Sequence, residues 1–356
     1  MTNRRIGREH PDGVDLPLDQ GGTSVRFSNF RPMLAAAAVT ALALVGSAAA
    51  QDLRPVTFAQ PSPSAINSFP VFVAIGEGFF AEEGLDVRVE SINGSSAVLQ
   101  ALSSGQAQIG RPGPGPVLGA RARGVDVVFI YNVAARSNFG ILVQEDSPYR
   151  SAADLKGTVV GVGTADGAEV SFARAVLGGA GLEEGSDFEF LTVGDGGPAT
   201  AAFTRGEISA YAASTADGAI MSQRGLVMRD LTPPSEMSLF GNGLAAMRST
   251  IEDDPELVEK FVRAFRRGHE FALDDANRAA VLAHLKAGMP QESEDADFAE
   301  SLFVAVRSKT VPVDPNHALG YQPPEVWERW LSIVEADLAG RIGELADAYT
   351  NDFVGE

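Results

Sequence analysis

Six polar or glycine-rich loops follow short apolar runs of this sequence, and their side chains offer hydrogen bonds and charges to a ligand. Where such runs are parallel strands, their carboxyl ends meet at one edge of a sheet, and the following helices direct unpaired backbone amides outward. Loops in this position predict a binding site for a small molecule. The candidate ligand-binding residues are Ser64, Asn67, Phe69, Gly94, Ser95, Ser96, Arg111, Pro112, Gly113, Asn138, Thr164, Asp166, Gly167, Asp195, Gly196 and Ser214.

Charged residues among these candidates predict the polarity of the ligand. Arg111 is the best candidate to pair with an anionic group, because a guanidinium matches the geometry of a sulfonate or a carboxylate. Asp166 and Asp195 are candidates for a ligand amine or ring N–H, although acids at the start of a helix also have a purely structural role. The loops mix aromatic, amide and acidic groups, so we expect an organic ligand rather than nitrate.

Several candidates have an equally good structural interpretation. Ser95 and Thr164 each fit the N-cap of a helix as well as a ligand contact. The proline-rich segment 112–116 also fits a rigid connector. Phe69, Phe72 and Tyr131 offer rings on which an aromatic ligand could stack, although the helical spacing of Phe72 favours a place in the core. The loops therefore predict the location of the site better than the role of each residue in it.

The sequence predicts no catalytic residue, no metal site and no cofactor. It contains no cysteine, which excludes disulfides, thiol nucleophiles and cysteine-ligated metals. The histidines lack the spacing of metal ligands. Gly161 and Gly163 begin a dinucleotide-type pattern, but Asp166 stands where its third glycine belongs. No G-x-S-x-G nucleophile elbow is present either.

Bulk charge and hydropathy narrow the class of partner. The formal net charge is −19 at pH 7, which predicts a surface that repels nucleic acid and anionic lipid. After the N-terminal segment, no apolar stretch is long enough to span a bilayer, so we expect no direct membrane insertion. The expected ligand is a small-molecule solute, and the expected oligomeric state is a monomer.

Residues 1–50 are predicted to be a leader with a signal peptide. Residues 32–45 form an apolar core, and Ala48 and Ala50 fit the small-residue cleavage rule, which leaves Gln51 as the new N-terminus. Translation is hypothesised to start at Val25, because residues 25–31 alone make a normal basic region before the apolar core. Export without a cysteine to carry a lipid predicts a location in the periplasm.

A repeated stretch predicts the elements that position the loops. Residues 86–105 align without a gap with residues 187–206, and both copies read as a strand, a turn, an Ala-rich helix closed by glycine, and a second short strand. A unit of this kind that occurs twice predicts two similar α/β lobes. Two facing lobes form a cleft in which a small molecule can bind.

The remaining pattern places the lobes along the chain. Strands are expected over 56–59, 106–109, 125–131, 139–144, 158–162, 207–211 and 239–247, and helices over 69–83, 164–177, from 254 onward and over 324–346. The runs 139–144 and 239–247 are the expected crossings between lobes. The predicted division is therefore residues 51–138 for the first part of lobe I, 139–241 for lobe II, and 242–356 for the return to lobe I with the C-terminal helices.

An ordered set of segments resembles the periplasmic substrate-binding proteins of ABC importers, in the sulfonate, nitrate, taurine and thiamine-pyrimidine-precursor branch. The resemblance covers essentially all of residues 52–340 and is carried by segments 69–87, 99–110, 154–162, 201–210 and 254–272. It implies the type II two-lobe α/β fold, in which each lobe is a mixed sheet flanked by helices and two crossing strands act as a hinge. It also implies delivery of the solute to an ABC permease in the inner membrane.

Two other functions remain open. The thiamine-pyrimidine synthases that this branch resembles use a cysteine-rich motif, which this chain lacks, so an enzyme on the same fold is the weaker alternative. The same two lobes could instead feed a sensor kinase, and a neighbouring permease gene or kinase gene would separate those two roles. The sequence favours a solute receptor, and the solute could be a sulfonate, pyrimidine, flavin, nitrate or aromatic acid.

Overall fold

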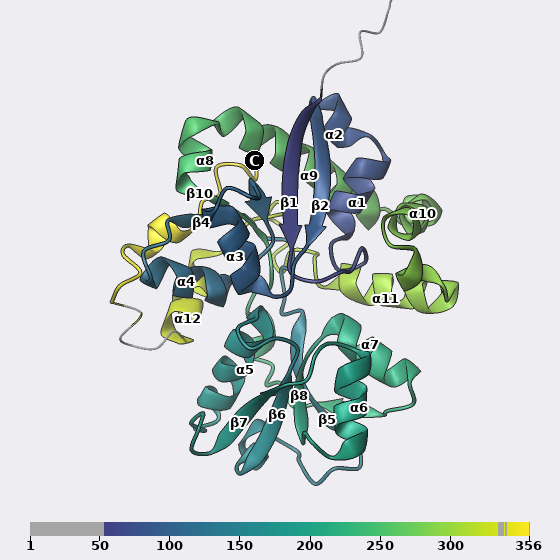
Figure 1. Ribbon diagram of the computed structural model, residues 1–356, viewed down its shortest axis with the longest axis vertical. Helices are drawn as coiled ribbons and strands as arrows, with labels where there is room; N and C mark the ends of the chain where they lie inside the picture. The colour runs from purple at the N-terminus through teal and green to yellow at the C-terminus, as the bar shows by residue number, and fades with distance from the viewer. Residues whose placement is uncertain (1–52, 334–337, 339, 356) are drawn as a thin grey trace, which may run out of the picture. The chain divides into compact units, whose positions relative to one another are not determined.

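The computed structural model of the protein describes residues 53–333, 338 and 340–355 (Figure 1). The predicted signal peptide, the cleavage site at Ala50 and the hypothetical start at Val25 lie outside the described residues. Within the described ranges, no helix has both the length and the apolar character that a membrane crossing requires.

The first sheet contains five strands in the order β2-β1-β3-β10-β4. β1 pairs in parallel with β2 and β3, whereas β10 runs antiparallel to β3 and β4. Every residue of β4 is buried, as expected for a strand that is covered on both faces. The strands are β1 (Arg54–Gln60), β2 (Leu85–Ser91), β3 (Ile109–Gly110), β4 (Val127–Tyr131) and β10 (Leu244–Met247).

The second sheet also contains five strands, in the order β7-β6-β8-β5-β9. β6 pairs in parallel with β7 and β8, and β5 runs antiparallel to β8 and β9. The strands are β5 (Phe139–Gln144), β6 (Thr158–Val162), β7 (Phe188–Thr192), β8 (Ala210–Ser214) and β9 (Met228–Asp230).

The two sheets have equivalent strand orders, which accounts for the repeat in the sequence. One copy supplies β2, α3 (Ser95–Ser103) and β3, and the other supplies β7, α6 (Gly197–Arg205) and β8 in the same places. The chain passes from β4 of the first sheet to β5 of the second and returns at β10. This confirms the α/β fold of two mixed sheets flanked by helices. The lobe boundaries at residues 138 and 241 stay predictions.

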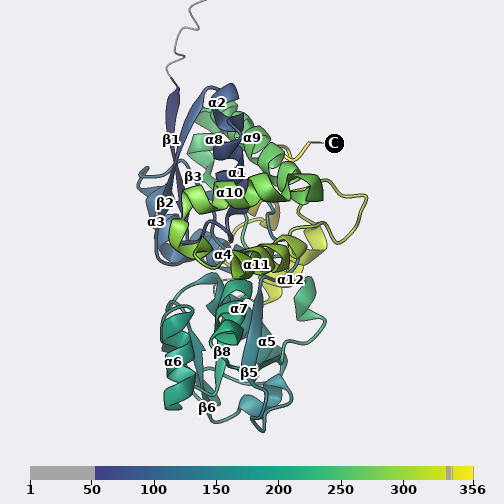
Figure 2. The same cartoon turned by 90° about the vertical axis from the view of Figure 1, so that its right-hand side faces the viewer.

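Helices cover both faces of the first sheet (Figures 1 and 2). On one face lie α1 (Phe69–Gly76), α2 (Phe79–Glu82) and α9 (Pro255–Leu273), where the ring of Phe58 in β1 lies 5.8 Å from that of Phe261. On the other face, α3 is joined by α4 (Pro114–Ala122) and α12 (Pro324–Ile333), and Trp327 lies edge-on to Phe129 at 5.4 Å.

The remaining helices flank the second sheet or extend from the first. α11 packs against α7, and Figure 2 shows α11 above α7 where the two lobes approach each other. The helices are α5 (Ala168–Gly179), α7 (Thr215–Gln223), α8 (Arg248–Asp253), α10 (Arg278–Gly288) and α11 (Ala296–Ser308), with short 3₁₀ turns η1 (Ala152–Leu155), η2 (Glu236–Ser238), η3 (Asp275–Asn277), η4 (Pro290–Ser293) and η5 (Leu345–Ala348).

Element boundaries differ from several expectations. The helix predicted over 69–83 is two helices, because the chain turns at Gly78 with φ of +78°. The strand predicted over 207–211 begins at Ala210, and the return strand predicted from 239 begins at Leu244. The helix predicted from Thr164 begins at Ala168. The helix predicted over 324–346 is described only to Ile333, and η5 follows at residues 345–348.

Candidate functional site

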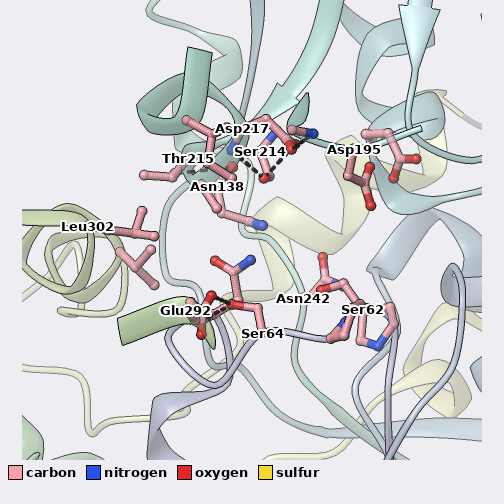
Figure 3. Close-up of a pocket in the computed structure, with 18 of the residues that line it drawn as sticks. Ser62, Ser64, Asn138, Asp195, Ser214, Thr215, Asp217, Asn242, Glu292 and Leu302 are labelled. Carbon is pink, nitrogen blue, oxygen red and sulfur yellow. Dashed lines mark hydrogen bonds between the residues drawn. The ribbon is translucent and has the colours of Figure 1, made fainter. Parts of the chain in front are cut away.

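A cavity of about 590 Å³ lies between the loops at the carboxyl ends of the strands in both sheets. Its walls come from the loops after β1, β2 and β3 on one side and from those after β6, β7 and β8 on the other. Figure 3 shows Asp195 and Asn138 extending into it opposite Ser64 and Asn242. Ten predicted residues line it: Ser64, Asn67, Gly94, Ser95, Arg111, Asn138, Thr164, Asp195, Gly196 and Ser214.

Three predicted residues lie in close packing instead. Phe69 is fully buried at the start of α1, where its ring lies edge-on to those of His269 and Phe303, at 5.4 Å from each. Its place on the inner face of α1 turns it into the core. Pro112 and Gly113 are buried between the sheets and do not line the cavity. Tyr131, also considered for stacking, is fully buried, and its hydroxyl lies 3.0 Å from Nδ1 of His269.

Ser96, Asp166 and Gly167 line a second, smaller cavity of about 160 Å³ between α4, α5 and α12. They face away from the larger cavity because the first turns of α3 and α5 meet there. The hydroxyl of Ser96 donates to the backbone oxygen of Asp166 at 3.2 Å. These three residues therefore contribute to a contact between the lobes rather than to the larger cavity.

Thr164 has a different role from the predicted helix cap. The N-cap of α5 is Gly167, and Thr164 donates from both its backbone N (3.0 Å) and its hydroxyl (2.9 Å) to Oε1 of Glu169. Glu169 lines the cavity, and burial raises the pKa of its carboxyl. Sequence reasoning missed Glu169 because a pair five residues apart matches no capping pattern.

Asp217 connects two of the loops on the second lobe. Its carboxylate accepts from Ser214 Oγ (2.7 Å), from Ser214 N (2.9 Å) and from Gly196 N (2.8 Å). Burial raises the pKa of Asp217 to about 6. Ser214 and Asp217 have the spacing of a capping box, so the sequence pattern could have predicted the role of Asp217.

Asp195 offers the most available carboxylate of this wall. Its recorded partner among the described residues is the hydroxyl of Tyr211, which lies 3.3 Å from Oδ1. Burial raises the pKa of Asp195, which lines the cavity from the loop after β7. Asp195 can therefore accept further hydrogen bonds from a ligand amine or ring N–H.

Arg111 lies on the opposite wall, at the end of β3. It is 5% exposed, and its Nε has no hydrogen-bond partner among the described residues. Burial lowers its pKa to about 10, so the guanidinium remains charged at neutral pH. Two hydrogen bonds fix the backbone of Arg111: its N donates to Ala59 O at 2.9 Å, and its O accepts from the Asn242 side chain at 3.2 Å.

Glu292 brings the C-terminal helical region to the cavity. It lies in η4, and its carboxylate accepts from Ser64 Oγ and from Ile66 N, the latter at 3.0 Å. Burial raises its pKa. Sequence reasoning missed it because 228 residues separate it from Ser64. Phe298 and Leu302 of α11 add an apolar patch to the same wall.

The charged residues of the cavity divide between acids and bases. The acids are Glu169, Asp195, Asp217, Glu292, Glu294 and Asp295, and the bases are Arg111, Arg224 and Lys309. No cluster of metal ligands occurs among the residues that the structure describes. The arrangement can hold a polar organic molecule by hydrogen bonds and charge pairing.

Known proteins resemble this chain along most of its length. A family model described as NMT1/THI5 like matches residues 65–279. The riboflavin-binding protein RibY of Chloroflexus aurantiacus is 28% identical over 316 residues, which cover 85% of this chain and 86% of that protein. A formylaminopyrimidine-binding protein of Halalkalibacterium halodurans is 26% identical over 289 residues, with 77% and 82% covered.

The fold is also shared with solved structures. The periplasmic aliphatic sulphonate binding protein SsuA of Escherichia coli superposes with a TM-score of 0.61 at 20% sequence identity. The superposition covers 79% of this chain and 85% of SsuA. At this identity the likeness concerns the fold. Together with the family match, it agrees with the resemblance that the sequence segments indicated.

Proposed function

The chain belongs to the NMT1/THI5-like family, and we propose that it is an exported receptor that binds one small organic solute between its two lobes. The observation that carries this proposal is the cavity of about 590 Å³ at the strand ends of both sheets. Loops from two lobes that share one cavity suit reversible capture, because a ligand that contacts both lobes favours their closed arrangement.

The solute is proposed to carry N–H donors, as a nitrogen heterocycle does. Asp195 keeps acceptor capacity on the second lobe, and Glu169 and Asp217 add negative charge beside it. A small inorganic anion such as nitrate would be repelled by these carboxylates. The names of two relatives, which bind riboflavin and formylaminopyrimidine, support the same class of ligand.

Transport, rather than turnover, is the proposed fate of the solute. Delivery to an ABC permease in the inner membrane is supported by a structural neighbour from Methylobacillus flagellatus, which is named as the periplasmic sulfonate-binding protein of a putative ABC transporter. The predicted signal peptide supports export to the periplasm, and β5 and β10 are the proposed hinge strands. The receptor is proposed to act as a monomer, and the N-terminal residue of the exported protein should be Gln51.

A thermal-shift screen tests the proposal. The panel contains aminopyrimidines, flavins, sulfonates, nitrate and aromatic carboxylates, with protein purified from a periplasmic extract. A true ligand at 100 to 1,000 times its Kd should stabilise the protein by roughly 3–4 kcal/mol. Mass spectrometry of the ligand after incubation should recover it unchanged. A panel without any shift would contradict the receptor proposal, and a chemically altered ligand would favour an enzyme.

A further inference from the structure

We propose that the solute is two-ended, with an oxyanion group that pairs with Arg111 on the first lobe and N–H donors that bind Asp195 on the second. This inference rests on the proposed receptor function and specifies the class of solute. It is argued from one buried cation and from the hydrogen bonds that occupy the acids around it.

Arg111 is buried without an anionic partner. No carboxylate among the described residues lies within ion-pair distance of its guanidinium, whereas the half-buried Arg121 of α4 pairs with Asp126 at 2.8 Å. A buried charge without a partner is costly, and folded proteins pair such charges or hydrogen-bond them. Arg224 is exposed and Lys309 is half-buried, so the other two bases of the cavity have access to solvent.

Three acids of the cavity accept hydrogen bonds from groups other than Arg111. Glu169 accepts two hydrogen bonds from Thr164, and Asp217 accepts from Ser214 and Gly196. Glu292, on the C-terminal wall, accepts from Ser64 and Ile66. These acids therefore already have partners, and none of them neutralises the guanidinium.

Among the described residues, the site thus offers an unpaired hydrogen-bond donor on the first lobe and a free hydrogen-bond acceptor on the second. Arg111 requires an acceptor, and a guanidinium prefers a planar or forked oxyanion such as a carboxylate. Asp195 can accept further hydrogen bonds from donors, because its protein partner among the described residues is the Tyr211 hydroxyl. A wholly anionic solute would meet the acids of the second lobe, and a wholly cationic solute would leave Arg111 unpaired. A solute with both groups also links the lobes.

The test compares three probes by isothermal titration calorimetry on the mature protein: 2-aminopyrimidine-5-carboxylate, 2-aminopyrimidine and pyrimidine-5-carboxylate. The first probe should bind about 10- to 100-fold more tightly than either single-ended probe, as expected for one additional charge-assisted contact. Arg111→Met should reduce the affinity for 2-aminopyrimidine-5-carboxylate to that for 2-aminopyrimidine. The affinity for 2-aminopyrimidine itself should not change. Asp195→Asn should weaken both amino probes and not pyrimidine-5-carboxylate.

A ligand-free measurement tests the unpaired charge independently. Arg111→Met should raise the melting temperature by roughly 2–4 °C, because it removes a buried charge without breaking an ion pair. The comparison variant Arg121→Met breaks the ion pair with Asp126 and should lower the melting temperature. A variant at Arg111 that melts lower than wild type, or does not fold, contradicts the inference.

Other outcomes separate this inference from the receptor function. Equal affinity of the two amino probes, or an Arg111→Met variant that binds all probes as wild type does, would overturn the two-ended solute. If none of the three probes binds while an uncharged heterocycle or a flavin stabilises the protein, the inference is wrong and the receptor function stands. If no compound of either panel binds, both are wrong.

Discussion

Gly113 and Ala168 meet across the two lobes with no space for a side chain between them: a Cβ at Gly113 would lie 2.4 Å from the Cβ of Ala168. Two residues further along α4, a Cβ at Gly115 would lie 2.5 Å from the Cβ of Ser171 in α5. The start of α4 therefore packs closely against α5 beside the ligand cavity. This contact depends on glycine at both positions, because real Cβ contacts are longer.

Gly115→Ala should weaken ligand binding without unfolding the protein. The new methyl group would separate α4 from α5, and a closed state disfavoured by about 1.4 kcal/mol lowers the affinity tenfold. Titration calorimetry with a ligand from the screen measures the effect. Gly119→Ala is the matched control on α4, because its Cβ would lie 3.6 Å from the nearest atom, Nη1 of Arg123. Equal affinities of the two variants would show that this contact does not control closure.

Asp217 should make the ligand-free protein more stable at mildly acidic pH. Burial raises its pKa from 3.8 to about 6, so between these values the folded state binds a proton that the unfolded state has lost. The stabilisation from this proton is complete below the unfolded pKa and is lost as pH rises through 6. Each pKa unit corresponds to about 1.4 kcal/mol, so the change between pH 4.5 and 7.5 should be about 2 kcal/mol.

Urea unfolding of wild type and Asp217→Asn at these two pH values isolates that contribution. Asparagine does not titrate, so the stability of wild type relative to the variant should be greater at pH 4.5 than at pH 7.5. Other buried acids titrate in both proteins and cancel in the difference. A difference that does not change with pH would assign the titration to another group.

Glu292→Ala should loosen the loop after β1 and weaken ligand binding. The substitution removes the acceptor of the Ile66 backbone N–H and of the Ser64 hydroxyl, which costs about 1–3 kcal/mol for a buried donor. Because Ser64 and Asn67 line the cavity, the affinity should fall together with the stability. Glu294→Ala is the control: this exposed neighbour makes no side-chain hydrogen bond to any residue that the structure describes, so its removal should change the unfolding free energy little.

Tyr131→Phe should affect stability and leave ligand binding intact. The hydroxyl of Tyr131 lies 3.0 Å from Nδ1 of His269, both residues are buried, and neither lines the cavity. Loss of this partner should cost about 1–3 kcal/mol in the free energy of unfolding. Tyr149→Phe provides the comparison, because the Tyr149 hydroxyl has no recorded partner in the described part of the chain. A large loss of affinity in Tyr131→Phe would place this residue in the binding site after all.

Much of the fold could be predicted because the signals are local. The repeat of residues 86–105 and 187–206 carries its own strand, turn and helix, and the structure places both copies equivalently in two sheets. The loops after these strands were predicted correctly as neighbours, since parallel strands end at the same edge. Phe69 is predicted as a ligand contact but lies in the core, because the direction of its ring is decided by packing against His269 and Phe303, which are far away in the chain.

The sequence by itself determined the two α/β units, the lack of thiol chemistry and the loops that face each other. Only the tertiary structure decided which charges remain available between them. Glu292 reaches Ser64 from 228 residues away, and Arg111 pairs with no acid of the described residues although six line the same cavity. The reason is physical: local propensity depends on neighbours in the chain, whereas burial and pairing of a charge depend on segments that only folding brings together.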